Sequence, residues 1–266
     1  MCGLAGVSRA TYYRHWLGSR PLEADTELRG MLQRHSLQHR HYGYRRLTQL
    51  VRRDGIEANH KHVLRLMHED NLLCLRRKAF VPVTTDSNHR WEPHRNLARG
   101  LKTTALNQLW VADITYIRLQ QQHVYAAVIL DAHSRRVIGW AVEAHLGSNL
   151  AIGALLMALS HRSPEPGMIH HSDRGVQYAC ADYVEILNQA GIQGSMSRVG
   201  NPHDNAKAES FMRTLKEEEV NDRQYRDIAA LRESLHEFFD KTYNAARLHS
   251  ALGYLTPIEF EQGICP

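Results

Sequence analysis

The sequence lacks several features that would place it in common protein classes. Its four cysteines, Cys2, Cys74, Cys180 and Cys265, form no Cys-x-x-Cys pair, so neither a disulfide framework nor a zinc ribbon is indicated. No apolar run approaches the roughly 18 residues of a membrane span, and no signal peptide opens the chain. These absences predict a cytoplasmic protein with no membrane segment.

Two catalytic patterns are also missing. There is no GxxxxGK loop followed by Ser or Thr, so nucleotide hydrolysis is not expected to drive the reaction. There is no GxSxG elbow, which argues against acyl transfer. Histidine, in contrast, is plentiful, and His35 and His39 have the spacing of half a zinc site. Because the other half is missing, we interpret these histidines as polar surface or groove residues.

Charge is distributed unevenly along an otherwise ordinary globular composition. Residues 1–100 hold 18 Lys and Arg against 9 Asp and Glu, whereas residues 101–266 hold 15 against 19. The first part therefore carries a net charge of +9 and the second −4, which together give the overall +5. A basic front half favours a polyanionic partner such as DNA, although a solvated basic surface is the alternative.

The basic half contains the outline of a helix-turn-helix. Ser8 is placed to cap a short helix within residues 6–14. A clearer helix is expected over 44–53, where Gly55 breaks the pattern, and another from the Asn59 cap through 70. The alternative is a helical hairpin that merely packs. Cationic side chains on the polar edge favour DNA contact: Arg45, Arg46, Arg52, Arg53, Lys61 and Arg65.

The rest of the chain begins with a basic, Pro-containing stretch over 76–106, which we interpret as a linker rather than a packed element. Strands are then expected over 109–117, 124–132 and 136–142, and helix 148–161 follows. The remaining expected elements are strand 168–171, helix 181–190, a short strand near 194–197 and a long helix over about 204–219. This order predicts an α/β fold, a mixed five-stranded sheet with helices on both faces.

Three acidic residues stand out by their setting. Asp113 lies in the middle of the first strand, where a carboxylate is costly to bury without a partner. Asp173 follows the strand 168–171, at the sheet edge where α/β proteins bind ligands. Glu209 lies one turn into the long helix. Taken singly, each acid is more simply a capping or ion-paired carboxylate, but together they are oxygen ligands suited to Mg²⁺ or Mn²⁺.

The helix around Glu209 strengthens the catalytic interpretation. Asn205, Glu209, Arg213 and Lys216 fall on one helical face. A metal-holding acid would then be flanked by cations that face the same groove, as gripping a phosphate backbone requires. The alternative is an exposed Glu–Arg pair on a solvated helix.

Three segments carry a family likeness. Residues 107–116 (NQLWVADITY), 171–178 (HSDRGVQY) and 200–210 (GNPHDNAKAES) resemble the three acidic motifs of bacterial insertion-sequence transposases in the retroviral-integrase superfamily. The likeness is to the group whose catalytic protein is encoded by the second of two overlapping reading frames. The 35 residues between Asp173 and Glu209 match that family's spacing, and the resemblance covers nearly the whole chain.

The resemblance implies an RNase H-like core with Asp113, Asp173 and Glu209 as catalytic metal ligands, two Mg²⁺ or Mn²⁺ ions, 3′-end cleavage by water and strand transfer to double-stranded DNA. It implies a helix-turn-helix region over 1–75, the linker over 76–106, an integrase core over 107–220 and a helical C-terminal extension over 221–266. We interpret Asn205, Lys207, Arg213, Lys216 and the basic residues of the first region, Arg45, Arg46, Lys61 and Arg65, as DNA contacts.

The resemblance also implies a homo-oligomer, a nucleoid-associated location, and an upstream-frame protein as partner or fusion. The residues Tyr243, Asn244, Arg247, His249, Leu252, Gly253, Thr256 and Pro257 are similar to the family's C-terminal signature. Leu248 departs from it, standing where the family often has proline, and leucine allows a helix to continue there. Two alternatives stay open: a catalytically silent DNA-binding regulator and an RNase H-like nuclease.

Overall fold

A computed structural model describes residues 25–74, 94–198, 202–221 and 223–263, without the side chains of residues 202 and 203. The chain divides into two compact units, Met1–Arg77 and Lys78–Pro266. The segment around Ser8 that was expected to form a helix lies outside the described residues.

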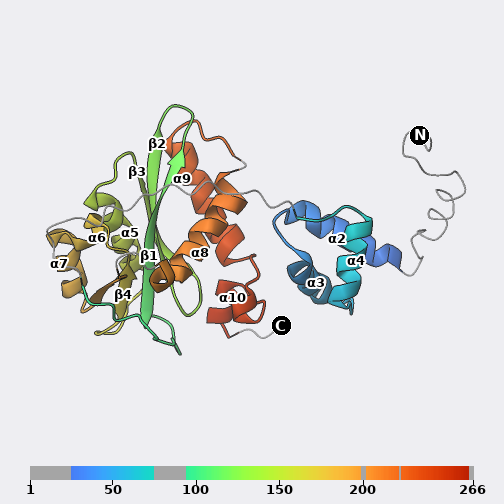
Figure 1. The fold of residues 1–266 in the computed structure, drawn as a ribbon, viewed down its shortest axis with the longest axis horizontal. Helices are drawn as coiled ribbons and strands as arrows, with labels where there is room; N and C mark the ends of the chain where they lie inside the picture. The colour runs from blue at the N-terminus through green and yellow to red at the C-terminus, as the bar shows by residue number, and fades with distance from the viewer. Residues whose placement is uncertain (1–24, 75–93, 199–201, 222, 264–266) are drawn as a thin grey trace, which may run out of the picture. The chain divides into compact units, whose positions relative to one another are not determined.

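The first unit is a bundle of three helices, α2 (Thr26–Gln38), α3 (Tyr44–Arg53) and α4 (His60–Glu69) (Figure 1). The helices α3 and α4 form the expected helix-turn-helix, and sequence periodicity predicted their bounds to within one residue. The turn uses Gly55 at a φ of +92°, a conformation that glycine adopts without a Cβ clash. Asn59 caps α4 by accepting a hydrogen bond from the Lys61 N–H. Helix α2 was not expected.

Leucine and valine side chains of all three helices are buried together, which makes the unit a packed core and not a lone hairpin. Leu32 of α2, Leu47 and Val51 of α3, and Val63 and Leu66 of α4 are each fully buried. The polar faces of the helices are therefore directed outward.

The second unit contains a five-stranded mixed sheet in the order β3-β2-β1-β4-β5 (Figure 1). The antiparallel strands β1, β2 and β3 come first in the chain, and β4 and β5 pair parallel to β1 and to each other. The observed strand bounds differ from the expected ones by at most one residue: Leu109–Arg118, His123–Asp131, Val137–Glu143, Ile169–Ser172 and Gln193–Met196. The expected α/β class and five-stranded sheet are confirmed.

Helices cover both faces of the sheet. On one face α5 (Ser148–His161), the short α6 (Val176–Ala179) and α7 (Ala181–Gln189) pack over Trp110 and Ala112 of β1. On the other face, α8 and the helices that follow it pack over Leu109 and Val111. Alternate residues of β1 thus serve two separate apolar layers, as a strand buried on both faces requires.

The long helix expected over 204–219 is composite. A 3₁₀ turn over Pro202–Asn205 leads into α8 (Ala206–Leu215), which continues as a π-helical segment over Lys216–Val220. The C-terminal extension then contains α9 (Ile228–Glu237), a second π-helical segment over Phe238–Asn244 and α10 (Pro257–Glu261).

Two expectations need correction. The linker was expected to be unpacked, but within its described part the Leu97 N–H donates to Ser195 Oγ of β5 and Ala98 packs on the core. This contact supplies the edge strand with a polar partner. Leu248 was expected to let a helix continue, yet the helical segment ends at Asn244 and the fully buried Leu248 lies beyond it. Leucine at this position therefore does not extend the helix and is instead buried.

Candidate active site

The register between β1 and β4 brings the first two acidic residues level with each other. Val111 pairs with His171 in the parallel ladder, so two residues further on Asp113 and Asp173 reach the same height. Strand β4 ends at Ser172, so β1 continues past its neighbour from Asp113 onward. Both carboxylates therefore lie where parallel strands end, the usual ligand position in such sheets.

Asp113 is held in an unfavourable electrostatic environment. Its Oδ1 accepts a hydrogen bond of 2.9 Å from the Ile114 N–H. Loss of surrounding water raises the pKa of Asp113 to about 8, and the negative charges of Asp173 and, more weakly, Glu209 add to that rise. All three acids thus share one electrostatic neighbourhood. Their mutual repulsion is the condition that a bound cation would relieve.

Asp173 lies in a tight connection between β4 and α6. Its Oδ1 accepts a hydrogen bond of 2.9 Å from the Gly175 N–H. A Cβ at residue 175 would lie 2.8 Å from Gln177 Oε1 and 3.0 Å from Asp173 Oδ1, so any other residue there would push on both side chains. The local backbone therefore fixes the orientation of this carboxylate.

Glu209 is an exposed residue in the first turn of α8, and two polar side chains beside it fix this end of the helix. Asn205 is buried, and its Nδ2 donates to the carbonyl of Ala112, the residue before Asp113, at 2.9 Å. The half-buried Lys207 donates from Nζ to the carbonyl of Ala132 at 3.0 Å. These two residues, whose DNA contacts stay a prediction, attach the start of α8 to β1 and to the turn that follows β2.

The two cations further along the same helical stretch differ in their exposure to solvent. Arg213 is exposed, whereas Lys216 is half-buried with its Nζ 4.4 Å from the centre of the Tyr116 ring. Burial lowers the pKa of Lys216, although Asp113 partly offsets this effect. Lys216 therefore lies beside the acidic site. Tyr116 was not singled out from the sequence, because one aromatic residue in a strand is an ordinary core residue.

The residues present are chemically suited to a hard divalent cation. Among the described residues, no three His, Cys, Asp or Glu side chains already stand in a metal-binding arrangement. The fit rests on the like charges around Asp113 and on Asn205 Oδ1, a buried oxygen with no hydrogen-bond partner among the described atoms. Carboxylate and amide oxygens are the ligands that Mg²⁺ and Mn²⁺ prefer.

A buried histidine supports this end of the sheet, and sequence reasoning missed it. The His171 ring bonds Ser195 Oγ at 2.9 Å and Ser197 Oγ at 3.1 Å, which fastens β4 to the end of β5. Burial lowers the pKa of His171, so the ring is neutral at physiological pH. Its position two residues before Asp173 was the available signal, but a histidine in a strand does not reveal its partners.

In the first unit, the four expected DNA contacts fall into two groups. Arg45 and Lys61 are exposed, and Arg46 is half-buried against the Tyr42 ring. Arg65, in contrast, pairs with Glu69 at 2.8 Å and reaches Asp25 at 3.4 Å. The Arg65 guanidinium is therefore already paired with carboxylates of its own unit.

Comparison with known families agrees with both units. A family model described as "Integrase core domain" matches residues 103–202, and a second model with that description matches residues 190–257. A model described as "HTH-like domain" matches residues 23–80. Among the described residues, no helix has the length and apolar character needed to span a bilayer.

Similar proteins include the transposase for insertion sequence element IS904 of Lactococcus lactis subsp. lactis (strain IL1403). It is 35% identical over 231 residues, which cover 83% of this chain and 87% of that protein. Transposase InsF for insertion sequence IS3A of Escherichia coli (strain K12) is 35% identical over 220 residues, covering 83% of this chain and 76% of that protein.

Solved structures also match. A chain of the simian T-cell lymphotropic virus intasome in complex with PP2A regulatory subunit B56 gamma has a TM-score of 0.51 and 19% identity, over 88% of this chain and 74% of that chain. This likeness shows a shared fold. The HTLV-2 integrase catalytic core domain in complex with magnesium matches with a TM-score of 0.45 and 16% identity, over 60% of this chain and 99% of that chain.

Proposed function

This chain belongs to the IS3 family of insertion-sequence transposases, and from that premise we propose that it cleaves the 3′ ends of its element and joins them to target DNA. Its second unit is an integrase-type catalytic core of the DDE polynucleotidyl transferase superfamily. The proposal assigns Asp113, Asp173 and Glu209 as the ligands of two Mg²⁺ or Mn²⁺ ions.

The observation that carries the proposal is the electrostatic setting of Asp113. A strand carboxylate with a pKa near 8 and two acidic neighbours is costly to ionise in the metal-free protein. Asp113 therefore holds a proton near neutral pH, which a divalent cation must displace on binding. Asp113, Asp173 and Glu209 would hold two such ions, which would supply stabilisation of the attacking and the leaving oxygen in a phosphoryl displacement.

The other residues around the site have roles in holding and orienting DNA. The exposed Arg213 of α8 and Lys216, at the start of its π-helical continuation, lie past Glu209, where their charges would contact phosphates that flank the scissile bond. In the first unit, α4 is the second helix of the helix-turn-helix, the position of a recognition helix. We assign it, with Arg45, Arg46 and Lys61, to the terminal inverted repeats.

The working assembly extends beyond one chain. Two element ends must be brought to one target, so we assign the active form to a homo-oligomer. We further assign the upstream-frame product as a partner or fused segment. Mixing the purified chain with and without that product on end-containing DNA, and measuring mass by light scattering, tests both assignments. An equally active monomer without the partner would contradict them.

The proposed chemistry is tested on DNA that carries the element's own ends, with Mg²⁺ present. Asp113→Asn, Asp173→Asn and Glu209→Gln should each lower cleavage and joining about 10³-fold, because each removes a charged metal ligand. Glu217→Gln is the matched control, since Glu217 is an exposed acid further along the same helical stretch and should retain activity. Full joining by Asp113→Asn would refute the site assignment.

The same assay separates the alternatives. A wild-type chain that binds terminal repeats but shows no metal-dependent cleavage, even with the upstream-frame product, would be a silent regulator. Faster cleavage of RNA–DNA hybrids than of terminal-repeat DNA would instead indicate an RNase H-like nuclease.

A further inference from the structure

The residues of the C-terminal signature lie outside the carboxylate site and still need a role. We propose that the segment 243–261 is a clamp that positions α8, the helix carrying Glu209, and that Arg247 and Asn244 are its main positioning residues. The inference rests on the proposed function, because it gives the clamp the task of holding a metal ligand.

The first arm of the clamp grips the helix that carries Glu209. Arg247 contacts both carboxylate oxygens of Glu218, with Nη2–Oε1 at 2.7 Å and Nε–Oε2 at 2.9 Å. Its Nη2 also lies 3.4 Å from Thr214 Oγ1. The ring of Tyr243 stands edge-on to Phe211, with 4.9 Å between ring centres. These contacts hold α8 and its π-helical continuation at points on the C-terminal side of Glu209.

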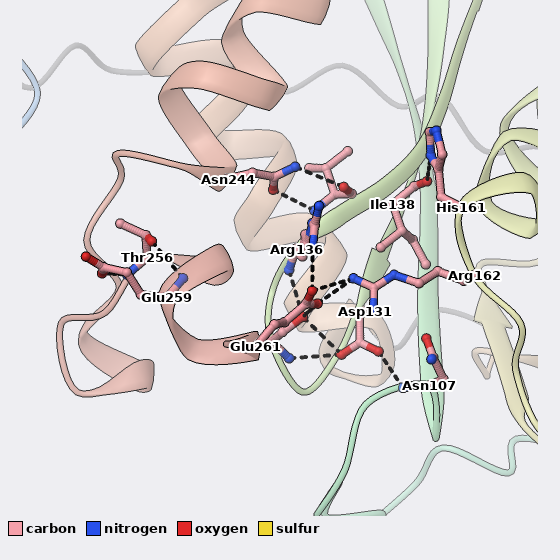
Figure 2. A network of polar contacts seen from close by, with 12 residues as sticks. Asn107, Asp131, Arg136, Ile138, His161, Arg162, Asn244, Thr256, Glu259 and Glu261 are labelled. Atoms are coloured by element: carbon pink, nitrogen blue, oxygen red, sulfur yellow. Dashed lines mark hydrogen bonds and ion pairs between the residues drawn. The ribbon is translucent and has the colours of Figure 1, made fainter. Parts of the chain in front are cut away.

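The second arm grips the sheet next to the β2–β3 turn. Asn244 forms a paired contact with the backbone of Val137, accepting from its N–H and donating to its carbonyl, both at 3.0 Å (Figure 2). Glu261 accepts hydrogen bonds from Ser134 Oγ at 2.7 Å and Arg136 Nη1 at 2.6 Å. The C-terminal segment is therefore bound to the first residue of β3 and to the turn that precedes it.

The helix held by the first arm and the turn held by the second arm are also bonded to each other. The turn held by Glu261 includes Ala132, whose carbonyl accepts the Lys207 Nζ of α8. Helix α8 is thus attached to this turn near its N-terminal end and to Arg247 beyond its C-terminal end. Glu209 lies between the two attachments, and a ligand held from both sides is pre-organised for an ion.

Other signature residues build the clamp itself. The His249 N–H donates to the Leu255 carbonyl at 3.0 Å, which closes the loop between the two arms. Gly253, at a φ of +67°, permits the turn inside that loop. Thr256 caps α10 in a capping box with Glu259, and α10 carries Glu261. Each of these residues therefore sets the position of one arm relative to the other.

Burial argues against a DNA-contact role for Arg247. Its side chain is 7% exposed and the Glu218 side chain is 10% exposed. A guanidinium that is engaged in this way with a carboxylate inside the protein has little surface to offer a phosphate. Removing one partner leaves the other as a buried unpaired charge, whereas replacing both with apolar residues of similar size is far less costly.

The test compares Arg247→Met, the double variant Arg247→Met/Glu218→Met, and Lys241→Met as matched control. Lys241 pairs with Glu237 in an exposed i,i+4 pair of the same C-terminal region. Mn²⁺ binding to the full chain is measured by electron paramagnetic resonance without DNA, at a temperature where thermal unfolding shows every variant folded. We expect Arg247→Met to weaken Mn²⁺ binding about 10-fold, as the loss of supporting contacts around ligands does. The double variant should recover most of that loss, and Lys241→Met should match wild type.

Two further measurements distinguish a loosened α8 from a lost DNA contact. Hydrogen exchange of residues 206–215 should accelerate in Arg247→Met and not in Lys241→Met. DNA affinity should stay within about two-fold of wild type, which is roughly 0.4 kcal/mol. Unchanged Mn²⁺ affinity and unchanged exchange in Arg247→Met would overturn the clamp, as would a loss confined to DNA affinity. If Glu209→Gln leaves Mn²⁺ binding intact, the metal assignment fails, and the exchange data still decide the clamp.

Discussion

Acidic side chains at two places in the catalytic unit have opposite surroundings. Asp131, which is fully buried, accepts hydrogen bonds from the backbone N–H groups of Asn107, His133 and Ser134 at 2.7–2.9 Å. Nearby, Glu261 faces Arg136 and Arg162 (Figure 2). Asp113 has one backbone donor and two acidic neighbours.

This contrast separates structural acids from functional ones. Burial alone would raise the pKa of Glu261, but hydrogen bonds from Ser134, Arg136 and Arg162 bring it below its ordinary value of 4.5. Burial and like charge act in the same direction on Asp113 and raise its pKa to about 8. Glu261 is therefore stabilised in its ionised form, whereas Asp113 is stable only with a proton or a cation.

The largest effect on folding is expected from Asp131→Asn. The asparagine amide would direct a donor at N–H groups that now share a carboxylate, so the free energy of unfolding should fall by about 3 kcal/mol. Urea denaturation of the metal-free chain measures this. Asp113→Asn is the comparison, because it removes a carboxyl group whose ionisation the folded site opposes, and it should leave stability equal or higher. A loss of stability in Asp113→Asn as large as that in Asp131→Asn would remove the distinction between the two groups.

A pH series sharpens the same comparison. The raised pKa of Asp113 means that the folded, metal-free chain binds a proton which the unfolded chain releases, so this residue lowers stability as pH rises from about 4 to about 8. At pH 8.5 the free energy of unfolding of Asp113→Asn should therefore exceed that of wild type by about 2 kcal/mol, and near pH 4 the two should be equal. The difference is smaller than the full pKa shift implies, because the Asp113 side chain keeps some water contact.

Glu261→Gln should show the opposite trend. The lowered pKa of Glu261 stabilises the folded chain above pH 4.5, and this contribution is lost as pH falls through the folded pKa. The variant should thus be less stable than wild type near neutral pH, by roughly 1 kcal/mol, and similar to it in acid. Parallel pH trends for Asp113→Asn and Glu261→Gln, from thermal melts in EDTA, would contradict the assignment of opposite environments.

The contrast also explains what the sequence could and could not predict. The strands and helices were predictable because their apolar residues alternate or repeat with helical spacing, and Asp113 stood out because it interrupts such a strand. Helical spacing also predicts that Asn205, Glu209, Arg213 and Lys216 share one face, and this stays a prediction. Their separate contacts could not be predicted, because helical spacing does not say which residue on a face meets the Ala112 carbonyl.

Partners far away in sequence were equally out of reach. Arg65 has the same charge and a similar helical setting to Lys61, and only the fold brings it to Asp25. Asp25 directly precedes helix α2, which the sequence did not reveal. This helix has mostly polar residues around Leu28 and Leu32, so its apolar pattern is too sparse to identify. Local patterns therefore identified the elements, whereas pairing between elements decided what each charge does.

The smallest expected effect extends the comparison to cations of the first unit. Lys61→Ala and Arg45→Ala should each lower affinity for terminal-repeat DNA about 3- to 10-fold and reduce the slope of log affinity against log salt by about 1, because each removes one phosphate contact. Arg65→Ala should change affinity less than two-fold, since the Arg65 guanidinium already pairs with Glu69 and Asp25. Fluorescence anisotropy from 50 to 200 mM salt measures all three. A salt slope reduced as much by Arg65→Ala as by Lys61→Ala would mean that DNA displaces the carboxylates, and that a paired charge in this protein is not a reliable mark of a structural one.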